Sequence, residues 1–418
     1  MQKLIIKGKK KLSGSINISG SKNATLPILA ASLLADKTII LKNIPLVQDV
    51  YTMINLLKFI GLNIEISKKI NTLEISSKKK LKTVAPYKLL KTMRAGVLVL
   101  GPLLAKYKKA KVSLPGGCAI GARPVNLHLF ALEKLGAKIK IKNGYIHAHA
   151  KQGLKGAKIK FPSISVGATE NAILAAVSAT GKTTISNCAI EPEIQDMIIF
   201  LKKMGCNINF IGNRKILIVG TKKFKNVSHK LIFDRIELGT YLIAAALAGK
   251  KVSFLKIKPK IIKTEIKLLK KMGVKMQVEK NKITIFESGK LKSVNIKTEP
   301  YPGFPTDLQA QVMVLMLKAS GISKITEKIF ENRFMHVPEL RRMGAKIITK
   351  KNVALVSGPT NLSGAEVMAT DLRASVSLVL AALIAENRTI INRIYHLDRG
   401  YENLEKKLKK CNVSISRL

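Results

Sequence analysis

A cysteine flanked by glycine is the residue of this chain best suited to proton transfer. Cys118 lies within Pro-Gly-Gly-Cys-Ala-Ile-Gly-Ala-Arg-Pro, residues 115–124, between a predicted strand at 111–114 and a predicted helix from Val125. The glycines favour an exposed loop, and Arg123 with nearby lysines would lower the thiol pKa from about 8.5. Cys118 is therefore predicted to act as an acid, base or nucleophile. The other cysteines lie in apolar contexts and are predicted to be packing residues: Cys188, Cys206 and Cys411.

A second phrase, Gly-Ser-Lys-Asn-Ala at 20–24, is typical of an anion site. It leads into a helix predicted to begin near Leu26. Gly20 would permit a close backbone approach, and the N-terminus of the following helix attracts anions. Lys22 would add a point charge for a phosphate or a carboxylate. The alternative is an ordinary capping turn with a solvated lysine.

A carboxylate follows the proline-rich phrase Tyr-Pro-Gly-Phe-Pro-Thr-Asp at 301–307. The prolines hold the chain extended, so that Thr306 or Asp307 opens the next helix. Asp307 is then either a helix N-cap or a general base facing a hydroxyl substrate.

Arginine is scarce here, with 12 residues against 62 lysines. Positions that keep the planar guanidinium indicate bidentate anion recognition, although some could form structural ion pairs. Half of the arginines lie in motif-like phrases: Arg94, Arg123, Arg333, Arg373, Arg393 and Arg399.

The elements that must position these residues follow from a repeat. The pattern Leu-x-x-x-Gly-x-x-apolar occurs six times, with spacings of 75, 69, 68, 71 and 68 residues between the glycine positions. Each copy predicts an amphipathic helix that ends at a residue of positive φ, followed by a strand. Asn in the sixth copy suits that conformation best among the other residues. The turn positions are Gly61, Gly136, Gly205, Gly273, Gly344 and Asn412.

Ala/Leu-rich helices, each followed by a strand, precede most copies and are predicted to be buried on most sides because they lack a wide polar face. Examples span 26–41, 171–185, 241–254 and 374–391. Six similar units in 418 residues predict two similar α/β domains of three repeats each.

The composition bears on partners. The net charge of +49 suggests nucleic-acid binding. However, lysines are spread over every segment, only 5% of residues are aromatic, and the excess is lysine rather than arginine. We therefore expect an anionic small substrate and no specific nucleic acid. No apolar run approaches twenty residues and the N-terminus lacks a signal-peptide core, so a cytoplasmic protein without a membrane partner is expected.

Taken together, these phrases resemble the UDP-N-acetylglucosamine 1-carboxyvinyltransferase family, and the resemblance runs in order from the first residue to the last. It implies two inside-out α/β domains of the enolpyruvyl transferase fold, 22–232 and 1–21 with 233–418, with the active site in the cleft between them. It also implies transfer of the enolpyruvyl group of phosphoenolpyruvate to the 3′-hydroxyl of UDP-N-acetylglucosamine, with release of phosphate, in peptidoglycan precursor synthesis. The matching phrases are those at 20–24, 115–124, 304–311, 331–340 and 370–375.

The resemblance assigns roles residue by residue. Cys118 is the general acid and the target of fosfomycin-type epoxides, and Asp307 is the base for the 3′-hydroxyl. The residues implied for phosphoenolpyruvate are Lys22, Asn23, Arg94, Arg123 and Arg399, of which Lys22 and Arg399 also count as catalytic. Those implied for UDP-N-acetylglucosamine are Asn23, Arg94, Arg123, Pro124, Val125, Asn126, Leu127, Ser165, Val166, Gly167, Asp307 and Ile329.

Two departures from the family pattern bear on uridine binding. The family often has Asp where this chain has Asn126, and it often has a Lys near the position of Ser163.

The alternative within the class is the sister enzyme that uses shikimate 3-phosphate; the Pro-Gly-Gly-Cys loop and Asn23 favour the sugar nucleotide. The implied chemistry requires no metal or organic cofactor. His147 and His149 lack a third ligand at metal spacing and are predicted to be surface residues.

Overall fold

The computed structural model describes residues 2–77, 81–116 and 124–418, so Cys118 and Arg123 lie outside the described residues. Within these, backbone contacts divide the chain into two compact units. Unit 1 takes residues 2–19 and 233–418, and unit 2 takes the described residues between 20 and 232. Each unit has its own hydrophobic core.

The strands of the two units form six small sheets that share one strand topology. In each sheet, a parallel pair is followed by two antiparallel pairings, as in β6-β7-β9-β8. The strands of unit 2 are β3 Ile39–Lys42, β4 Asn63–Ser67, β5 Thr72–Ser76, β6 Val84–Ala85, β7 Lys109–Ser113, β8 Lys138–Lys142, β9 Tyr145–His149, β10 Lys158–Lys160, β11 Lys182–Ser186, β12 Asn207–Gly212, β13 Lys215–Val219 and β14 Val227–Lys230.

Unit 1 draws strands from both ends of the chain. β1 pairs with β24 and β25, and β2 pairs with β15. Its strands are β1 Leu4–Lys7, β2 Leu12–Ile16, β15 Gly249–Leu255, β16 Met276–Glu279, β17 Lys282–Phe286, β18 Leu291–Lys292, β19 Asn295–Lys297, β20 Ala319–Thr326, β21 Ile347–Lys350, β22 Val353–Gly358, β23 Glu366–Met368, β24 Arg388–Asn392 and β25 Ser414–Arg417.

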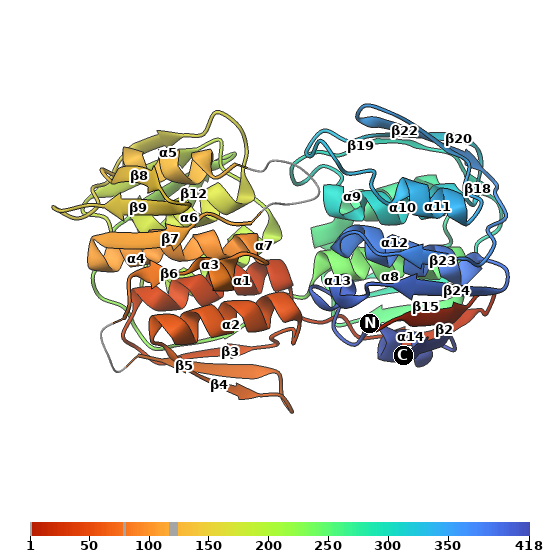
Figure 1. Cartoon of the computed structure of the whole chain (residues 1–418), viewed down its shortest axis with the longest axis horizontal. Helices are drawn as coiled ribbons and strands as arrows, with labels where there is room; N and C mark the ends of the chain where they lie inside the picture. Colours follow the sequence, from red (N-terminus) through yellow and green to blue (C-terminus); the bar gives the residue numbers. More distant parts are fainter. Residues whose placement is uncertain (1, 78–80, 117–123) are drawn as a thin grey trace. The chain divides into compact units, whose positions relative to one another are not determined.

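Helices fill the interior of each unit. In unit 1, α8, α10 and α12 pack against one another, with β20 and β22 on one side and β15 and β2 on the other (Figure 1). Every residue of α8 is buried, and α12 is buried from Arg373 to Leu383, which confirms the prediction from their Ala/Leu-rich composition. Every residue of α10 is buried as well. The helices of unit 1 are α8 Arg235–Ala248, η3 Pro259–Ile262, α9 Lys263–Lys271, η4 Thr306–Leu308, α10 Gln309–Met316, α11 Val337–Arg342, α12 Leu372–Ile384, α13 Tyr395–Asp398 and α14 Leu404–Lys409.

In unit 2, α1 and α6 occupy the equivalent interior positions and are also largely buried. Helix α1 begins at Lys22, four residues before the predicted start, because the side chain of Ser21 caps it by accepting from Ala24 N at 3.3 Å. The helices are α1 Lys22–Ala31, η1 Ser32–Leu34, α2 Gln48–Ile60, α3 Tyr87–Leu90, η2 Arg94–Val99, α4 Leu100–Tyr107, α5 Asn126–Lys134, α6 Val166–Ala176 and α7 Pro192–Lys203.

All six predicted turn positions adopt positive φ. The five glycines have φ between 91° and 124°, and Asn412 has φ 69°. Five of them follow one of the helices α2, α5, α7, α9 and α11 and precede the next strand, and Asn412 stands in the same place after α14. The repeat is therefore confirmed as a structural unit. Among the described residues, no helix is long and apolar enough to span a membrane.

Candidate active site

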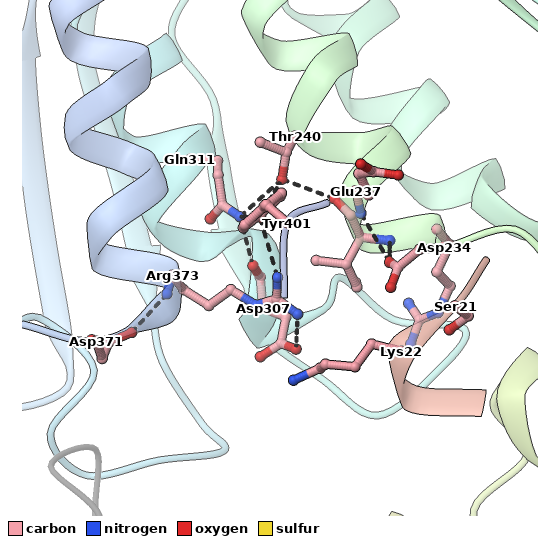
Figure 2. A network of polar contacts seen from close by, with 12 residues as sticks. Ser21, Lys22, Asp234, Glu237, Thr240, Asp307, Gln311, Asp371, Arg373 and Tyr401 are labelled. Carbon is pink, nitrogen blue, oxygen red and sulfur yellow. Dashed lines mark hydrogen bonds and ion pairs between the residues drawn. The ribbon is translucent and has the colours of Figure 1, made fainter. Parts of the chain in front are cut away.

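The carboxylate of Asp307 is held between two arginines in unit 1. Arg333 donates from Nη2 to Oδ1 at 2.7 Å, and Arg373 donates from Nη2 to Oδ2 at 2.8 Å. The arginine side chains are only 5% and 7% exposed, whereas that of Asp307 is 30% exposed. A partly exposed carboxylate is thus paired with two largely buried guanidinium groups, and Figure 2 shows the bond from Arg373.

This geometry excludes one of the two interpretations of Asp307. The cap position of η4 belongs to Pro305 and has no side-chain hydrogen bond, so the N-cap alternative is wrong. The side chain of Asp307 is 30% exposed, so the general-base interpretation stays a prediction for this carboxylate.

The true helix cap in this region is Asp371, at the start of α12. It accepts from the backbone N–H groups of Arg373 at 2.8 Å and Ala374 at 3.1 Å. The cap fixes the first turn of α12, which carries Arg373 toward Asp307. Burial alone would lower the pKa of Arg373, but Asp307, Tyr401 and Asp234 together outweigh this effect and raise the pKa.

Behind Arg373 lies a buried polar cluster that links three helices. The hydroxyl of Tyr401 lies 3.2 Å from Arg373 Nη1 and 2.9 Å from Thr240 Oγ1. Gln311 donates from Nε2 to the backbone oxygen of Asp307 at 2.9 Å. Figure 2 shows Thr240, Gln311 and Arg373 converging on Tyr401 from α8, α10 and α12.

Sequence reasoning missed Glu327, which organises the neighbouring loop. Its Oε1 accepts from the backbone N–H groups of Ile329 at 2.8 Å and Phe330 at 3.2 Å, and its Oε2 accepts from Thr306 Oγ1 at 2.9 Å. Glu327 is 2% exposed, while Ile329 is 36% exposed. One buried carboxylate therefore fixes both Ile329 and the residue before Asp307; no motif in the sequence marks it.

Arg399 ends α13, which packs against α12. The approach depends on Gly400, because a Cβ there would lie 2.7 Å from the side chain of Leu372, the first residue of α12. This contact places the end of α13 beside the turn that carries Arg373.

In unit 2, Lys22 is the first residue of α1, and its Nζ lies 3.0 Å from Asp49 Oδ2 on α2. Both side chains are largely buried, at 12% and 7% exposure, so the alternative of a solvated lysine is wrong. Gly20 does permit a close approach, but to the backbone: a Cβ would lie 1.8 Å from the carbonyl oxygen of Asn43. Asn23 follows Lys22 in the first turn of the same helix.

Arg94 begins η2, which packs against α1. The structure thus joins the elements that carry Lys22 and Arg94, although the two phrases are far apart in sequence.

The phrases at 124–127 and 165–167 also come together. Asn126 and Leu127 open α5, and Ser165 caps α6, accepting from Ala168 N at 3.3 Å. The two helices approach so closely that a Cβ on Gly167 would lie 3.1 Å from the ring of His128. Asn171 fixes this arrangement, since its amide nitrogen lies 3.2 Å from His128 Nδ1 and its Oδ1 accepts from Gly101 N at 2.8 Å.

The described cysteines are buried, as predicted. Burial raises the pKa of Cys188 to about 11 and that of Cys206 to about 12, and it raises the pKa of Cys411. No group of three or more His, Cys, Asp or Glu residues in the described part of the chain could hold a metal ion.

Comparisons with known proteins identify the family of this chain. A family model described as EPSP synthase (3-phosphoshikimate 1-carboxyvinyltransferase) matches residues 6–408. A UDP-N-acetylglucosamine 1-carboxyvinyltransferase of Pelagibacter ubique is 61% identical over 418 residues, which is 100% of both chains. The chain belongs to this family. The enzyme of the same name from Rickettsia akari is 52% identical, again over 100% of both chains.

Solved structures support the enolpyruvyl transferase fold. The enolpyruvyl transferase NikO from Streptomyces tendae superposes with a TM-score of 0.88 at 24% identity, covering 100% of this chain and 98% of that one. An EPSP synthase from Acinetobacter baumannii gives a TM-score of 0.78 at 18% identity, covering 100% and 99%. The enolpyruvyl transferase fold expected for this chain, two α/β domains of three repeats each, is thereby confirmed.

Proposed function

We propose that this protein transfers the enolpyruvyl group of phosphoenolpyruvate to the 3′-hydroxyl of UDP-N-acetylglucosamine, releasing phosphate, in peptidoglycan precursor synthesis. The observation that carries this function is the 61% identity over the full length of both chains with a UDP-N-acetylglucosamine 1-carboxyvinyltransferase. The reaction is an addition followed by an elimination through a tetrahedral intermediate. Addition removes a proton from the sugar hydroxyl, joins its oxygen to C2 of phosphoenolpyruvate and delivers a proton to C3. Elimination then removes a proton from C3 and breaks the bond between C2 and the phosphate oxygen, so that phosphate leaves.

Asp307 is the base in this proposal. Support comes from its partly exposed carboxylate, which the largely buried guanidinium groups of Arg333 and Arg373 hold in place. Cys118 is the acid that protonates C3, by resemblance to the family.

The anionic groups of phosphoenolpyruvate are bound by Lys22, Asn23, Arg94, Arg123 and Arg399. Support comes from the Lys22–Asp49 pair, which holds the lysine at the first turn of α1 instead of leaving it in solvent. A helix N-terminus favours an anion at that position.

UDP-N-acetylglucosamine is bound by three parts of the chain. The adjacent N-termini of α5 and α6 offer backbone N–H donors for the diphosphate, through 124–127 and 165–167. Asp307 and Ile329 contact the sugar, and the bonds from Glu327 support the position of Ile329. The remaining residues proposed to bind UDP-N-acetylglucosamine are Asn23, Arg94 and Arg123. Asn126 lacks the charge of the Asp often found there, so a hydrogen bond from the uridine part to a carboxylate at this position is not part of this proposal.

In this proposal the two domains implied by the resemblance, 22–232 and 1–21 with 233–418, both contribute residues that act on the two substrates. No metal or organic cofactor takes part, and no specific nucleic acid or membrane partner is involved. We also propose a cytoplasmic location, where both substrates are available.

The test measures release of phosphate from phosphoenolpyruvate with UDP-N-acetylglucosamine or shikimate 3-phosphate as acceptor, each with and without a metal chelator. We expect release with the sugar nucleotide alone, unaffected by the chelator. Release supported by shikimate 3-phosphate alone would show that the sister reaction is the correct one.

A further inference from the structure

The hydroxyl of Tyr401 is the centre of a buried hydrogen-bond chain behind Asp307. Tyr401 is 3% exposed, Thr240 is 1% exposed and Gln311 is fully buried. The chain runs from the backbone of α8 through Thr240 and Tyr401 to Arg373, and from there to Asp307. These groups are removed from solvent, so each buried donor and acceptor must find its hydrogen-bond partner within the chain.

The direction of each bond can be worked out from the end of the chain. The Thr240 hydroxyl donates to the carbonyl oxygen of Ile236 at 2.8 Å, which uses its only proton. Tyr401 must therefore donate to Thr240 Oγ1 across the 2.9 Å contact. The lone pairs of the Tyr401 oxygen are then left to accept from Arg373 Nη1 at 3.2 Å and from Gln311 Nε2 at 3.4 Å.

Arg373 is thus fixed at two points. Nη1 donates to Tyr401, Nη2 donates to Asp307, and the guanidinium carbon lies 5.7 Å from the centre of the Tyr401 ring. A planar guanidinium held at both nitrogens cannot rotate without breaking one bond. The orientation of the Asp307 carboxylate therefore depends on the phenol hydroxyl.

We propose that Tyr401 is a positioning residue for the reaction, which orients the base Asp307 through Arg373. The inference rests on the proposed function, because it takes Asp307 as the base. Tyr401 itself has no contact with substrate in this role; Thr240 and Gln311 fix its hydroxyl, and its effect passes through the guanidinium.

The substitution Tyr401→Phe isolates this hydroxyl. Phenylalanine keeps the ring beneath the guanidinium and the apolar packing, but it leaves a buried N–H of Arg373 without its acceptor. Arg373 then has a weaker hold on the carboxylate, so the charged form of Asp307 is less stabilised. We expect the pKa of Asp307 to rise and kcat to fall about tenfold, with smaller changes in the KM of either substrate.

The pKa of Asp307 can be followed in the full-length protein by carbon-13 NMR with aspartate labelled at Cγ. The chain has seven aspartates, and Asp307→Asn identifies the signal of Asp307 by its loss. Tyr241→Phe is the matched control: Tyr241 is 1% exposed on α8, and among the described residues its hydroxyl has no hydrogen-bond partner. We expect no shift of the Asp307 signal in this control.

An Asp307 titration midpoint in Tyr401→Phe equal to that of the wild type overturns the inference, as does a shifted midpoint with unchanged kcat. If Tyr401→Phe does not fold, Thr240→Val replaces it, because loss of the acceptor frees the Tyr401 hydroxyl to turn; it must shift the midpoint in the same direction. Activity of Asp307→Asn reports separately on the proposed function. A fully active Asp307→Asn enzyme removes Asp307 as the base, whereas the NMR shift still decides whether Tyr401 orients it.

Discussion

The ammonium group of Lys22 lies 3.0 Å from a carboxylate oxygen of Asp49, and both side chains are almost removed from solvent. A buried ion pair is strongly destabilised when one partner is removed, because the other charge is left uncompensated. Asp49 therefore gives Lys22 a fixed place at the start of α1 and makes the lysine costly to replace.

Lys22→Met should raise the KM for phosphoenolpyruvate by about 10- to 100-fold, since one charge-assisted hydrogen bond to a phosphate or carboxylate is lost. It should also lower Tm, and adding Asp49→Asn should recover part of that loss without restoring the KM. Steady-state kinetics and thermal unfolding of the single and double variants test both statements. A normal KM in Lys22→Met would remove this residue from the anion site.

Epoxides of the fosfomycin type should alkylate Cys118 and leave the other three thiols unmodified. Cys188, Cys206 and Cys411 are buried and their pKa values are raised, so they hold little thiolate at neutral pH. Mass spectrometry of peptides locates the adduct; modification of any buried cysteine at a comparable rate contradicts the assignment.

Replacement of Cys118 separates its acid role from its nucleophilicity. Cys118→Asp should escape alkylation and keep turnover, because a carboxylic acid with a raised pKa can also deliver a proton. Cys118→Ser should lose most activity, since a hydroxyl is a far weaker acid. An active serine variant would show that the thiol is not the acid.

Glu327→Gln should raise the KM for UDP-N-acetylglucosamine by about tenfold, with less effect on kcat. The amide nitrogen cannot accept a hydrogen bond, so either the loop at Ile329 or the hydroxyl of Thr306 loses its partner. Glu331→Gln is the matched control, because Glu331 is exposed four residues further along. Equal KM values for the two variants would mean that Glu327 has no part in binding the sugar.

The pH dependence of stability should report on Glu237, which lies in the first turn of α8 in unit 1. Burial raises its pKa from 4.5 to about 7, although Lys407 donates to it at 2.6 Å. In this range the folded protein keeps a proton that the unfolded chain loses, so this group's contribution falls as pH rises from 4.5 to 7. The difference is a few kcal/mol, at about 1.4 kcal/mol per pKa unit.

Glu237→Gln should abolish this component, so the variant should gain Tm relative to the wild type as pH rises from 5 to 7. His336 acts in the opposite direction in the same window, because burial lowers its pKa to about 4. Both proteins keep His336, so the difference between them isolates Glu237. A Tm difference that does not change with pH contradicts the assignment.

The repeat architecture was predictable from sequence because a left-handed turn after a helix restricts the residue type to Gly or Asn. The partners of Asp307 were not predictable, although the scarcity of arginine marks both Arg333 and Arg373 as candidate functional residues. They lie 26 and 66 residues away, and only the packing of α10 against α12 brings the second one close. Arg333 and Arg373 therefore bind an internal carboxylate, which was the alternative interpretation of these residues.

Capping positions were the other source of error. Ser21 and Asp371 cap their helices, whereas Asp307 does not, although all three residues are of types that can cap a helix. Local sequence shows which residues can cap a helix but not which one has a stronger partner elsewhere in the chain. Glu327 and Asp49 were missed for the same reason, since their partners lie in other elements or in the backbone.

The strands β1 and β2 set an order of assembly during translation. Both leave the ribosome first, yet β1 pairs with β24 and β25, and β2 pairs with β15, which are made much later. Unit 2 takes all its described residues from the span between 20 and 232, so it can form its core while most of unit 1 is still unsynthesised. The nascent chain must therefore keep β2 unpaired until β15 emerges and β1 unpaired until β24 and β25 emerge, so the sheet of β23, β24, β1 and β25 closes after the sheet that contains β2.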